Sequence, residues 1–394
     1  MIRRPSVVSE QLLSKLKMTL LIRCKGINML SLPLELWITI IQHNYYKEDG
    51  SIDIRTLFSS ALVHPQWTEP AQSLLFHSIP LDEIVKSKRE DCFFESIKVH
   101  GSKLGSYVRR LIVNIGQYPS SADGSIAIHY FTLLLNFFPK LYEITLRVYG
   151  VYQFDKPSME ELGIVAPHIR SLNLLRFGVQ SPILYQLIEL WPNIQFLAIG
   201  AEIVASPPSI PPKIKLYELM LLRSLIPFTS LEWLLSKSEN TLKVFELRDL
   251  PGRRMKSILA KHGPHLRSLR LLHYNKDSAD LLRLCTQLEE FVIYRIPDVI
   301  HIQTLPTTIE HFSFRNPGTG IKSYKGQIIS LMDKLPKLRV VTCDVRAAEH
   351  HGFAALKSAC DAKGAELQVR SWPWWLVSFF SFSLFLGIMN AVAD

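Results

Sequence analysis

The stretches "IRSLNL" (169–174), "IQFLAI" (194–199) and "LYELML" (216–221) carry apolar residues at their first, fourth and sixth positions. The same hexamer pattern occurs ten times between residues 108 and 343, and the other copies are "VRRLIV", "LYEITL", "LKVFEL", "LRSLRL", "LEEFVI", "IEHFSF" and "LRVVTC". A proline stands two residues before the hexamer at Pro139, Pro167, Pro192, Pro264 and Pro336. Since proline ends helices and favours extended backbone, the pattern predicts a short strand in each copy.

The hexamers start 21 to 33 residues apart, and helix-like runs lie between them. Examples are "SPILYQLIELW" (181–191), "SLEWLLSKS" (230–238) and "SADLLRLC" (278–285), with apolar residues near i, i+3, i+4 and i+7. This strand-turn-helix unit resembles the irregular leucine-rich repeats common in fungal proteins, whose period is about 20–29 residues. The Asn or Cys that usually follows the strand is mostly missing.

The resemblance implies an α/β fold over residues 81–370: an irregular leucine-rich-repeat solenoid with a parallel sheet on its concave face. An ordinary α/β domain with a doubly wound sheet would also alternate strands and helices. No glycine-rich phosphate loop follows any predicted strand, which favours the solenoid. A solenoid offers a broad binding surface in place of a deep pocket.

Three short helices are predicted before the repeats. The first lies in "LSLPLELWITIIQH" (30–43), where Pro33 fits the first turn. The second lies in "DIRTLFSSALV" (53–63), with apolar residues at i, i+3, i+4, i+7 and i+8, and should end before Pro65. The third should begin near Pro70, with Thr68 as its N-cap.

Three motifs in this segment resemble an F-box of the form frequent in basidiomycete fungi. They are L-P-x-E-L (32–36), A-L-V-x-x-x-W (61–67) and A-x-x-L-L-F-x-x-I (71–79), so the likeness covers residues 30–80. Two features depart from the family: His64 stands where cysteine is frequent, and the loop at 44–52 is long. The likeness implies that these helices bind a Skp-type adaptor, and through it a cullin. The implied adaptor-binding residues are Leu32, Pro33, Leu36, Ile40, Leu62, Val63 and Trp67.

Composition argues against several other classes of function. The net charge is +10, yet residues 1–30 alone hold six basic residues against one acid, so the remaining chain carries only +5. We therefore expect no nucleic-acid groove. The five cysteines are scattered, which indicates free thiols in a reducing compartment, cytoplasmic or nuclear. No catalytic motif, cofactor loop or metal-ligand spacing is found, so we expect a non-catalytic protein without metal or cofactor.

The two ends of the chain carry separate expectations. Residues 1–29 are predicted to form a basic, disordered tail. Residues 371–393, within the C-terminal segment 371–394, are uncharged, and as a helix they would extend about 35 Å, enough to cross a bilayer. The run is either a tail anchor in a membrane or a cap on the last repeat, and both alternatives stay open.

The leading hypothesis is a substrate-recognition subunit of a cullin-RING ubiquitin ligase, which binds the Skp adaptor through the F-box and an unidentified client protein through the repeats. The alternative is a non-catalytic repeat scaffold for protein–protein interaction, with or without a membrane tether.

Overall fold

The computed structural model describes residues 34–43, 52–87, 90–164, 168–222, 226–248, 255–272, 274–294, 300, 304–315 and 328–370. The chain divides into two compact units. We call the first the helical unit; its described part comprises residues 34–43 and 52–75. The second, Phe76–Ser371, is the sheet unit. The predicted tail at 1–29 and the C-terminal run at 371–394 lie outside the described residues.

The helical unit contains helices α2 (Leu34–His43), α3 (Ile54–Val63) and α4 (Pro65–Leu75). Helix α3 begins at its N-cap Asp53, whose carboxylate accepts a hydrogen bond from the Thr56 amide at 3.1 Å. It ends where predicted, because His64 precedes a proline and adopts an extended conformation. A small core of Ile41, Leu57 and Ala71 joins the three helices.

The third helix differs from its prediction, because it begins at Pro65 and contains Pro70 in its interior. Pro65 fits the first helical position, where no amide hydrogen is needed. Pro70 lacks the amide that would bond to Gln66, but Gln66 lies in the exposed first turn. Thr68 does not cap this helix, since its hydroxyl donates to the carbonyl of Ala61 at 2.8 Å. Burial of Ala71 against α3 holds the helix continuous past the proline.

The sheet unit alternates strands with helices along the chain. The strands are β1 (Ser78–Pro80), β2 (Arg110–Gly116), β3 (Ser125–Ile126), β4 (Glu143–Tyr149), β5 (Ser171–Arg176), β6 (Phe196–Ile199), β7 (Glu218–Leu221), β8 (Val244–Leu247), β9 (Ser268–Leu271), β10 (Glu290–Ile293), β11 (His311–Phe314), β12 (Val340–Asp344) and β13 (Glu366–Arg370). The helices are α5 (Leu81–Lys86), α6 (Glu90–Gly105), α7 (Ile128–Leu135), α8 (Lys156–Ile164), α9 (Ile183–Leu190), α10 (Phe228–Leu235), α11 (Met255–His262), α12 (Lys276–Leu282), α13 (Ser330–Lys334), α14 (Val345–Ala348) and α15 (Phe353–Lys363), with a short 3₁₀ turn, η3, at Gly263–His265.

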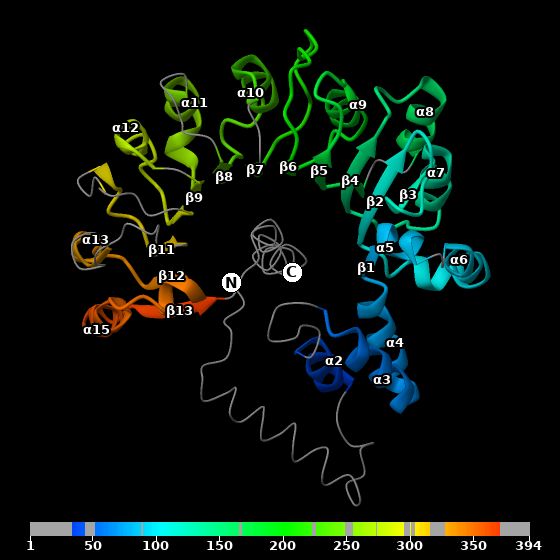
Figure 1. Cartoon of the computed structure of the whole chain (residues 1–394), viewed down its shortest axis with the longest axis horizontal. Coiled ribbons are helices and arrows are strands. Elements are labelled where there is room, and N and C mark those ends of the chain that lie inside the picture. The colour runs from blue at the N-terminus through cyan, green and yellow to red at the C-terminus, as the bar shows by residue number, and fades with distance from the viewer. Residues whose placement is uncertain are drawn as a thin grey trace, which may run out of the picture. The chain divides into compact units, whose positions relative to one another are not determined.

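Within the described residues these strands form one thirteen-stranded sheet, and all pairings between its strands are parallel. Leaving aside β3, which pairs with β2, each strand lies beside the next strand along the chain. In the sheet unit the strands follow the inner side of a curve and the helices follow the outer side (Figure 1). The predicted α/β fold with a parallel sheet is therefore confirmed.

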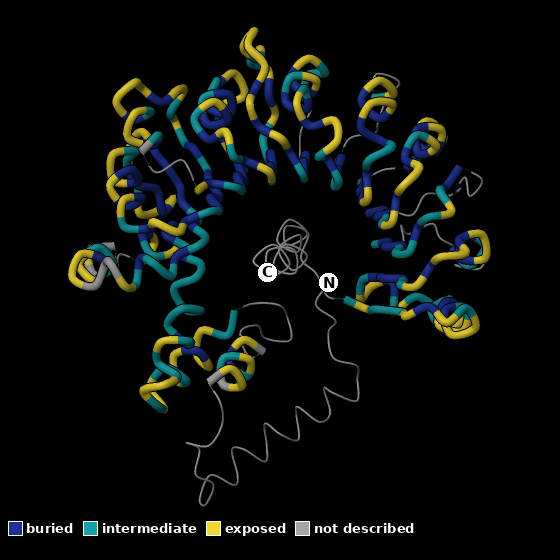
Figure 2. The backbone as a smooth tube through the Cα atoms, turned by 180° about the vertical axis from the view of Figure 1, so that it is seen from behind, coloured by how far each residue is buried: buried dark blue, intermediate teal, exposed yellow. Residues whose placement is uncertain are grey.

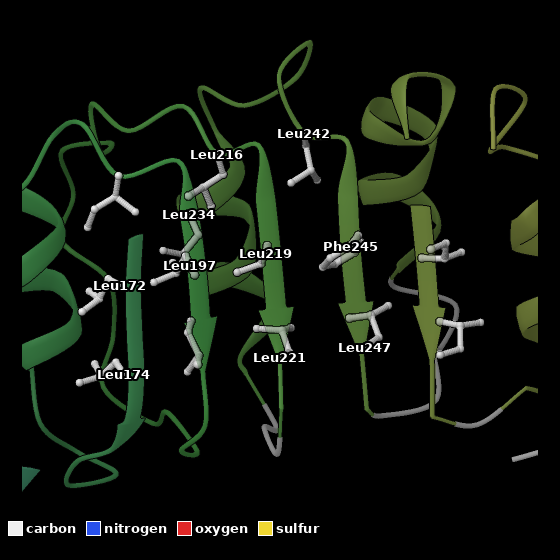
Figure 3. Close-up of a cluster of buried hydrophobic side chains, with 14 of the residues drawn as sticks. Leu172, Leu174, Leu197, Leu216, Leu219, Leu221, Leu234, Leu242, Phe245 and Leu247 are labelled. Carbon is white, nitrogen blue, oxygen red and sulfur yellow. The ribbon is translucent and has the colours of Figure 1, made fainter. Parts of the chain in front are cut away.

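The hexamer pattern fixes the register of the core. Each of the ten hexamers begins two residues before its strand, as at Val108 before β2, and its three apolar positions are buried, as at Leu111 and Val113. Equivalent leucines from adjacent strands stack in rows beneath the helices (Figure 3). The buried residues accordingly form a layer between sheet and helices, and the exposed ones lie largely on the outer helices and loops (Figure 2).

Leaving β3 aside, the sheet has one strand more at each end than the ten hexamers predict. Strand β1 lies inside the segment expected to belong to the F-box-like module, and its Ile79 is buried in the core of the sheet unit. The division between the compact units thus falls after Leu75, before the expected boundary at residue 80. Strand β13 ends the sheet and pairs with β12.

Candidate functional site

The residues predicted to bind an adaptor are divided between the surface and the core of the helical unit. Leu36 on α2 is exposed, and Leu62 and Val63 at the end of α3 are 73% and 55% exposed. Ile40 is half-buried, and Trp67 packs against the small core of the unit. Leu32 and Pro33 lie outside the described residues.

Helix α3 presents an apolar ridge to solvent. The predicted apolar face splits in two: Leu57 is fully buried, whereas Ile54 and Phe58 are 61% and 58% exposed. Ile54, Phe58 and Leu62 are spaced at i, i+4 and i+8 and therefore line one side of the helix. We call these three residues, with the adjoining Val63, the α3 ridge. Large apolar side chains gathered on the surface of a small unit indicate an interaction site.

The second candidate surface is the face of the sheet opposite the helices. Along a strand successive side chains point to opposite faces, so the hexamer positions between the buried ones point away from the core. These positions carry Glu218, Glu246, Arg270, Glu290 and His311 on five successive strands, β7 to β11. Arg270 lies 3.1 Å from Glu290, 3.7 Å from Glu218 and 4.0 Å from Glu246. We call these five residues the charged ladder.

The charged ladder is largely removed from water, and its pKa values follow from that. Burial raises the pKa of Arg270's partner Glu246, although Arg270 and Arg248 oppose the effect. Burial also acts to raise the pKa of Glu290, but Arg270 and His311 outweigh it and hold that pKa well below its ordinary range. The three carboxylates in turn raise the pKa of Arg270, against the effect of its burial. Within the ladder Arg270 therefore stabilises the charged form of Glu290, whereas at Glu246 the effect of burial outweighs that of the nearby cations.

Further polar and aromatic side chains lie beside the charged ladder. The imidazole of His311 contacts Glu290 through Nδ1 at 3.2 Å and Thr342 through Nε2 at 2.9 Å. The guanidiniums of Arg248 and Arg315 each lie 5.4 Å from the centre of the Tyr294 ring, a cation–π arrangement. This part of the inner face therefore offers charged and aromatic groups held in fixed positions by neighbouring strands.

A second, smaller ion-paired group lies on β2, β4 and β5. Arg110 Nε is 2.9 Å from Glu143, and the Asn173 amide donates to the same carboxylate at 3.0 Å. Burial raises the pKa of Glu143, while Arg110 and Asn173 oppose this. Sequence reasoning named none of these inner-face residues. Aligning the hexamers in register would have found them, because residues at the same hexamer position lie side by side.

Within the part of the chain that the structure describes, no group of three or more His, Cys, Asp and Glu side chains could hold a metal ion. Cys285, Cys343 and Cys360 are free and buried. Among the described helices, none combines the length and the apolar character needed to cross a membrane. Both alternatives for residues 371–393 concern residues outside that part of the chain.

Comparison with models of known protein families and with curated proteins found no match to this chain. Two features of the molecule therefore bear on its function, the α3 ridge and the inner face of the sheet.

Proposed function

We propose that this protein is a substrate-recognition subunit of a cullin-RING ubiquitin ligase. Its helical unit would bind a Skp-type adaptor, and through it a cullin, in the manner of an F-box. The sheet unit would be an irregular leucine-rich-repeat solenoid that binds a client protein. The protein itself would be non-catalytic, and the transfer of ubiquitin would belong to partner subunits.

The α3 ridge carries the adaptor part of this proposal. A unit of three short helices with a core of Ile41, Leu57 and Ala71 buries little apolar surface of its own. It nevertheless leaves Phe58 and Leu62 more than half exposed. Covering such side chains with a partner removes apolar area from water, at about 25 cal/mol per Å². Leu62 and Val63 are also two of the residues that the F-box resemblance assigns to adaptor binding.

The inner face of the sheet supports the client part. Parallel strands that follow one another in chain order form a continuous face, and the residues at its inner-face positions differ from strand to strand. Directly after β8, β10 and β11, Arg248, Tyr294 and Arg315 lie near one another, and His311 on β11 contacts Glu290. Arginine and tyrosine are enriched where proteins bind proteins.

A binding assay between the full chain and a purified Skp adaptor tests the proposal. The test variant is Leu62→Asp, which places a charge on the α3 ridge without touching the core. The matched control is Leu133→Asp on α7, because Leu133 is a leucine of similar exposure, 58%, on a helix of the sheet unit. Circular dichroism should confirm that both variants fold.

We expect the parent and Leu133→Asp to bind the adaptor alike, and Leu62→Asp to lose about tenfold or more in affinity, as for a residue at the centre of an interface. Equal binding by both variants would show that the ridge is not the adaptor site. Failure of the folded parent to bind any Skp adaptor would refute the ligase proposal and favour a repeat scaffold without a link to ubiquitin.

A further inference from the structure

The connection between β6 and β7 differs from its neighbours because it contains no helix. Residues 200–217, all described, are irregular, whereas α9 precedes β6 and α10 follows β7 (Figure 1). This connection contains the sequence "SPPSIPPK" (206–213), with four prolines in six residues. Proline cannot donate a backbone hydrogen bond and interrupts helices, which explains the missing helix.

The connection is nevertheless anchored to the sheet unit. Ile203 and Ile214, on either side of the proline segment, are buried in the core. The hydroxyl of Tyr185 on α9 donates to the carbonyl of Ala205 at 2.8 Å. The indole of Trp233 on α10 donates to the carbonyl of Ile210 at 2.8 Å. The segment is therefore presented in a defined place on the outer side of the unit.

The residues of this segment that face solvent follow a recognisable order. Residues 207–213 read apolar, Pro, x, apolar, Pro, x, Lys. Pro208, Pro211 and Lys213 are exposed, Ile210 is 77% exposed, and Pro212 is buried. A large apolar side chain so far exposed gains nothing from folding, since it stays in water.

The order has a physical meaning in a polyproline II helix, which has three residues per turn. Residues 207 and 210 then form one edge, residues 208 and 211 form a second, and Pro212 belongs to the third. Aromatic-lined grooves of SH3-type domains read two adjacent apolar edges of this kind. A lysine two residues after the last proline of the motif adds a charge that acidic residues beside such a groove can bind.

We propose that residues 207–213 are a docking segment for an SH3-type domain of a partner protein, with an aromatic groove and an acidic rim. Pro208 and Pro211 occupy its groove with Ile210, and Lys213 meets its acidic rim. This site lies on the sheet unit and does not depend on the α3 ridge, so it stands or falls separately from the adaptor proposal.

Trp233 controls access to this segment. In the free protein the chain bends at Ser209 and Ile210, and the Trp233 indole holds the Ile210 carbonyl at the bend. Docking in an extended form requires that this hydrogen bond break and the segment straighten. Removing the indole N–H while keeping an aromatic ring against Tyr185, as in Trp233→Phe, therefore favours docking.

The test is biolayer interferometry with the immobilised full chain and a panel of purified SH3 domains that bind P-x-x-P-x-basic peptides. The loss-of-contact variants are Pro208→Ala/Pro211→Ala and Lys213→Ala. The matched control is Pro119→Ala/Pro157→Ala, which changes two exposed prolines elsewhere in the sheet unit. Thermal melting of every variant establishes that it is folded.

We expect at least one domain to bind the parent and the control equally. The double proline variant should bind about tenfold or more weakly, because two apolar contacts are lost. Lys213→Ala should weaken binding about threefold, as for a solvent-exposed ion pair, and Trp233→Phe should tighten it about two- to tenfold, the net effect of one hydrogen bond. No binding by any domain, or equal binding by the double proline variant, would overturn the proposal.

Discussion

Replacing Arg270 by methionine should destabilise the sheet unit strongly. The side chain of Arg270 is only 9% exposed, and it neutralises three carboxylates that lie between 3.1 and 4.0 Å away. Methionine fills a similar volume but leaves Glu218, Glu246 and Glu290 without that cation. Removing one partner of a buried ion pair costs about 3–5 kcal/mol in the free energy of unfolding, and we expect a loss in this range.

The loss should depend on pH in a definite direction. Loss of Arg270 leaves burial less opposed at Glu246, so the pKa of Glu246 rises further. It also removes the main influence that lowers the pKa of Glu290. A carboxylate whose folded pKa lies above its unfolded value, about 4.3 for glutamate, destabilises the fold while it is charged. This destabilisation disappears as the pH falls and the folded protein takes up the proton. The difference between variant and parent should therefore be largest at pH 7 and smaller at pH 5.

Urea unfolding at both pH values, followed by circular dichroism, measures the difference. Hydrogen exchange of β8 to β10 gives the local effect, because repeats need not unfold as one unit. Arg267→Met is the matched control: Arg267 lies three residues away and pairs with Glu289, but both side chains are about half exposed. Such a pair contributes about 0–1 kcal/mol.

The reasoning about burial would be refuted by either of two results. One is a loss for Arg270→Met no larger than the loss for Arg267→Met. The other is a loss that stays the same, or grows, between pH 7 and pH 5, since that would mean that the ladder carboxylates do not take up protons when their cation is removed.

Three further predictions concern the core, a helix end and a thiol. Leu197→Ala, in the centre of the buried layer (Figure 3), should cost about 3 kcal/mol in urea unfolding, and a cost below 1 kcal/mol would contradict close packing there. Asn275 accepts a hydrogen bond from the Ser278 amide at 2.9 Å as the N-cap of α12. Asn275→Ala should therefore cost about 1 kcal/mol, read from thermal or urea unfolding, and no change would exclude a capping role. Burial raises the pKa of the Cys285 thiol to about 12. Iodoacetamide at pH 8 should accordingly label Cys285 only after unfolding, as followed by peptide mass spectrometry, and rapid labelling of the native protein would show the site to be open.

The sheet could be predicted because the hexamer combines the alternation of a strand with a buried position in the turn that precedes the strand. Positions four and six, such as Leu172 and Leu174, alternate as a strand requires, and position one, such as Ile169, adds the turn that enters the core. The two end strands do not follow from the ten hexamers, for different reasons. "FHSIPL" (76–81) fits the hexamer pattern and leads into β1, but its residues were assigned to the F-box likeness. Strand β13 follows Gly364, so its first apolar position is absent.

The candidate sites were harder to predict, because periodicity reports which side chains share a face and not what covers that face. On α3 the side of the helix that carries Leu57 and the side that carries Phe58 are adjacent, and both are apolar in sequence. Only the structure shows that Leu57 is buried while Phe58 remains exposed. The prediction that the third helix begins near Pro70 was wrong for another reason. Proline is common in the first turn of a helix, but here packing of Ala71 against α3 keeps Pro70 inside the helix.

The charged ladder specifies the order and register of the central strands. The buried hexamer positions are nearly alike in all copies, so they cannot distinguish one strand register from another. The inner-face positions differ, and Arg270 meets its three glutamates only when β7 to β10 keep their present order and register. A shift by one residue would turn Arg270 into the apolar core, where a guanidinium is costly. The residues that set the register are therefore nearly buried. If a client binds this face, as proposed, it meets partly exposed side chains such as His311 that these charges already hold in place, which lowers the entropy lost on binding.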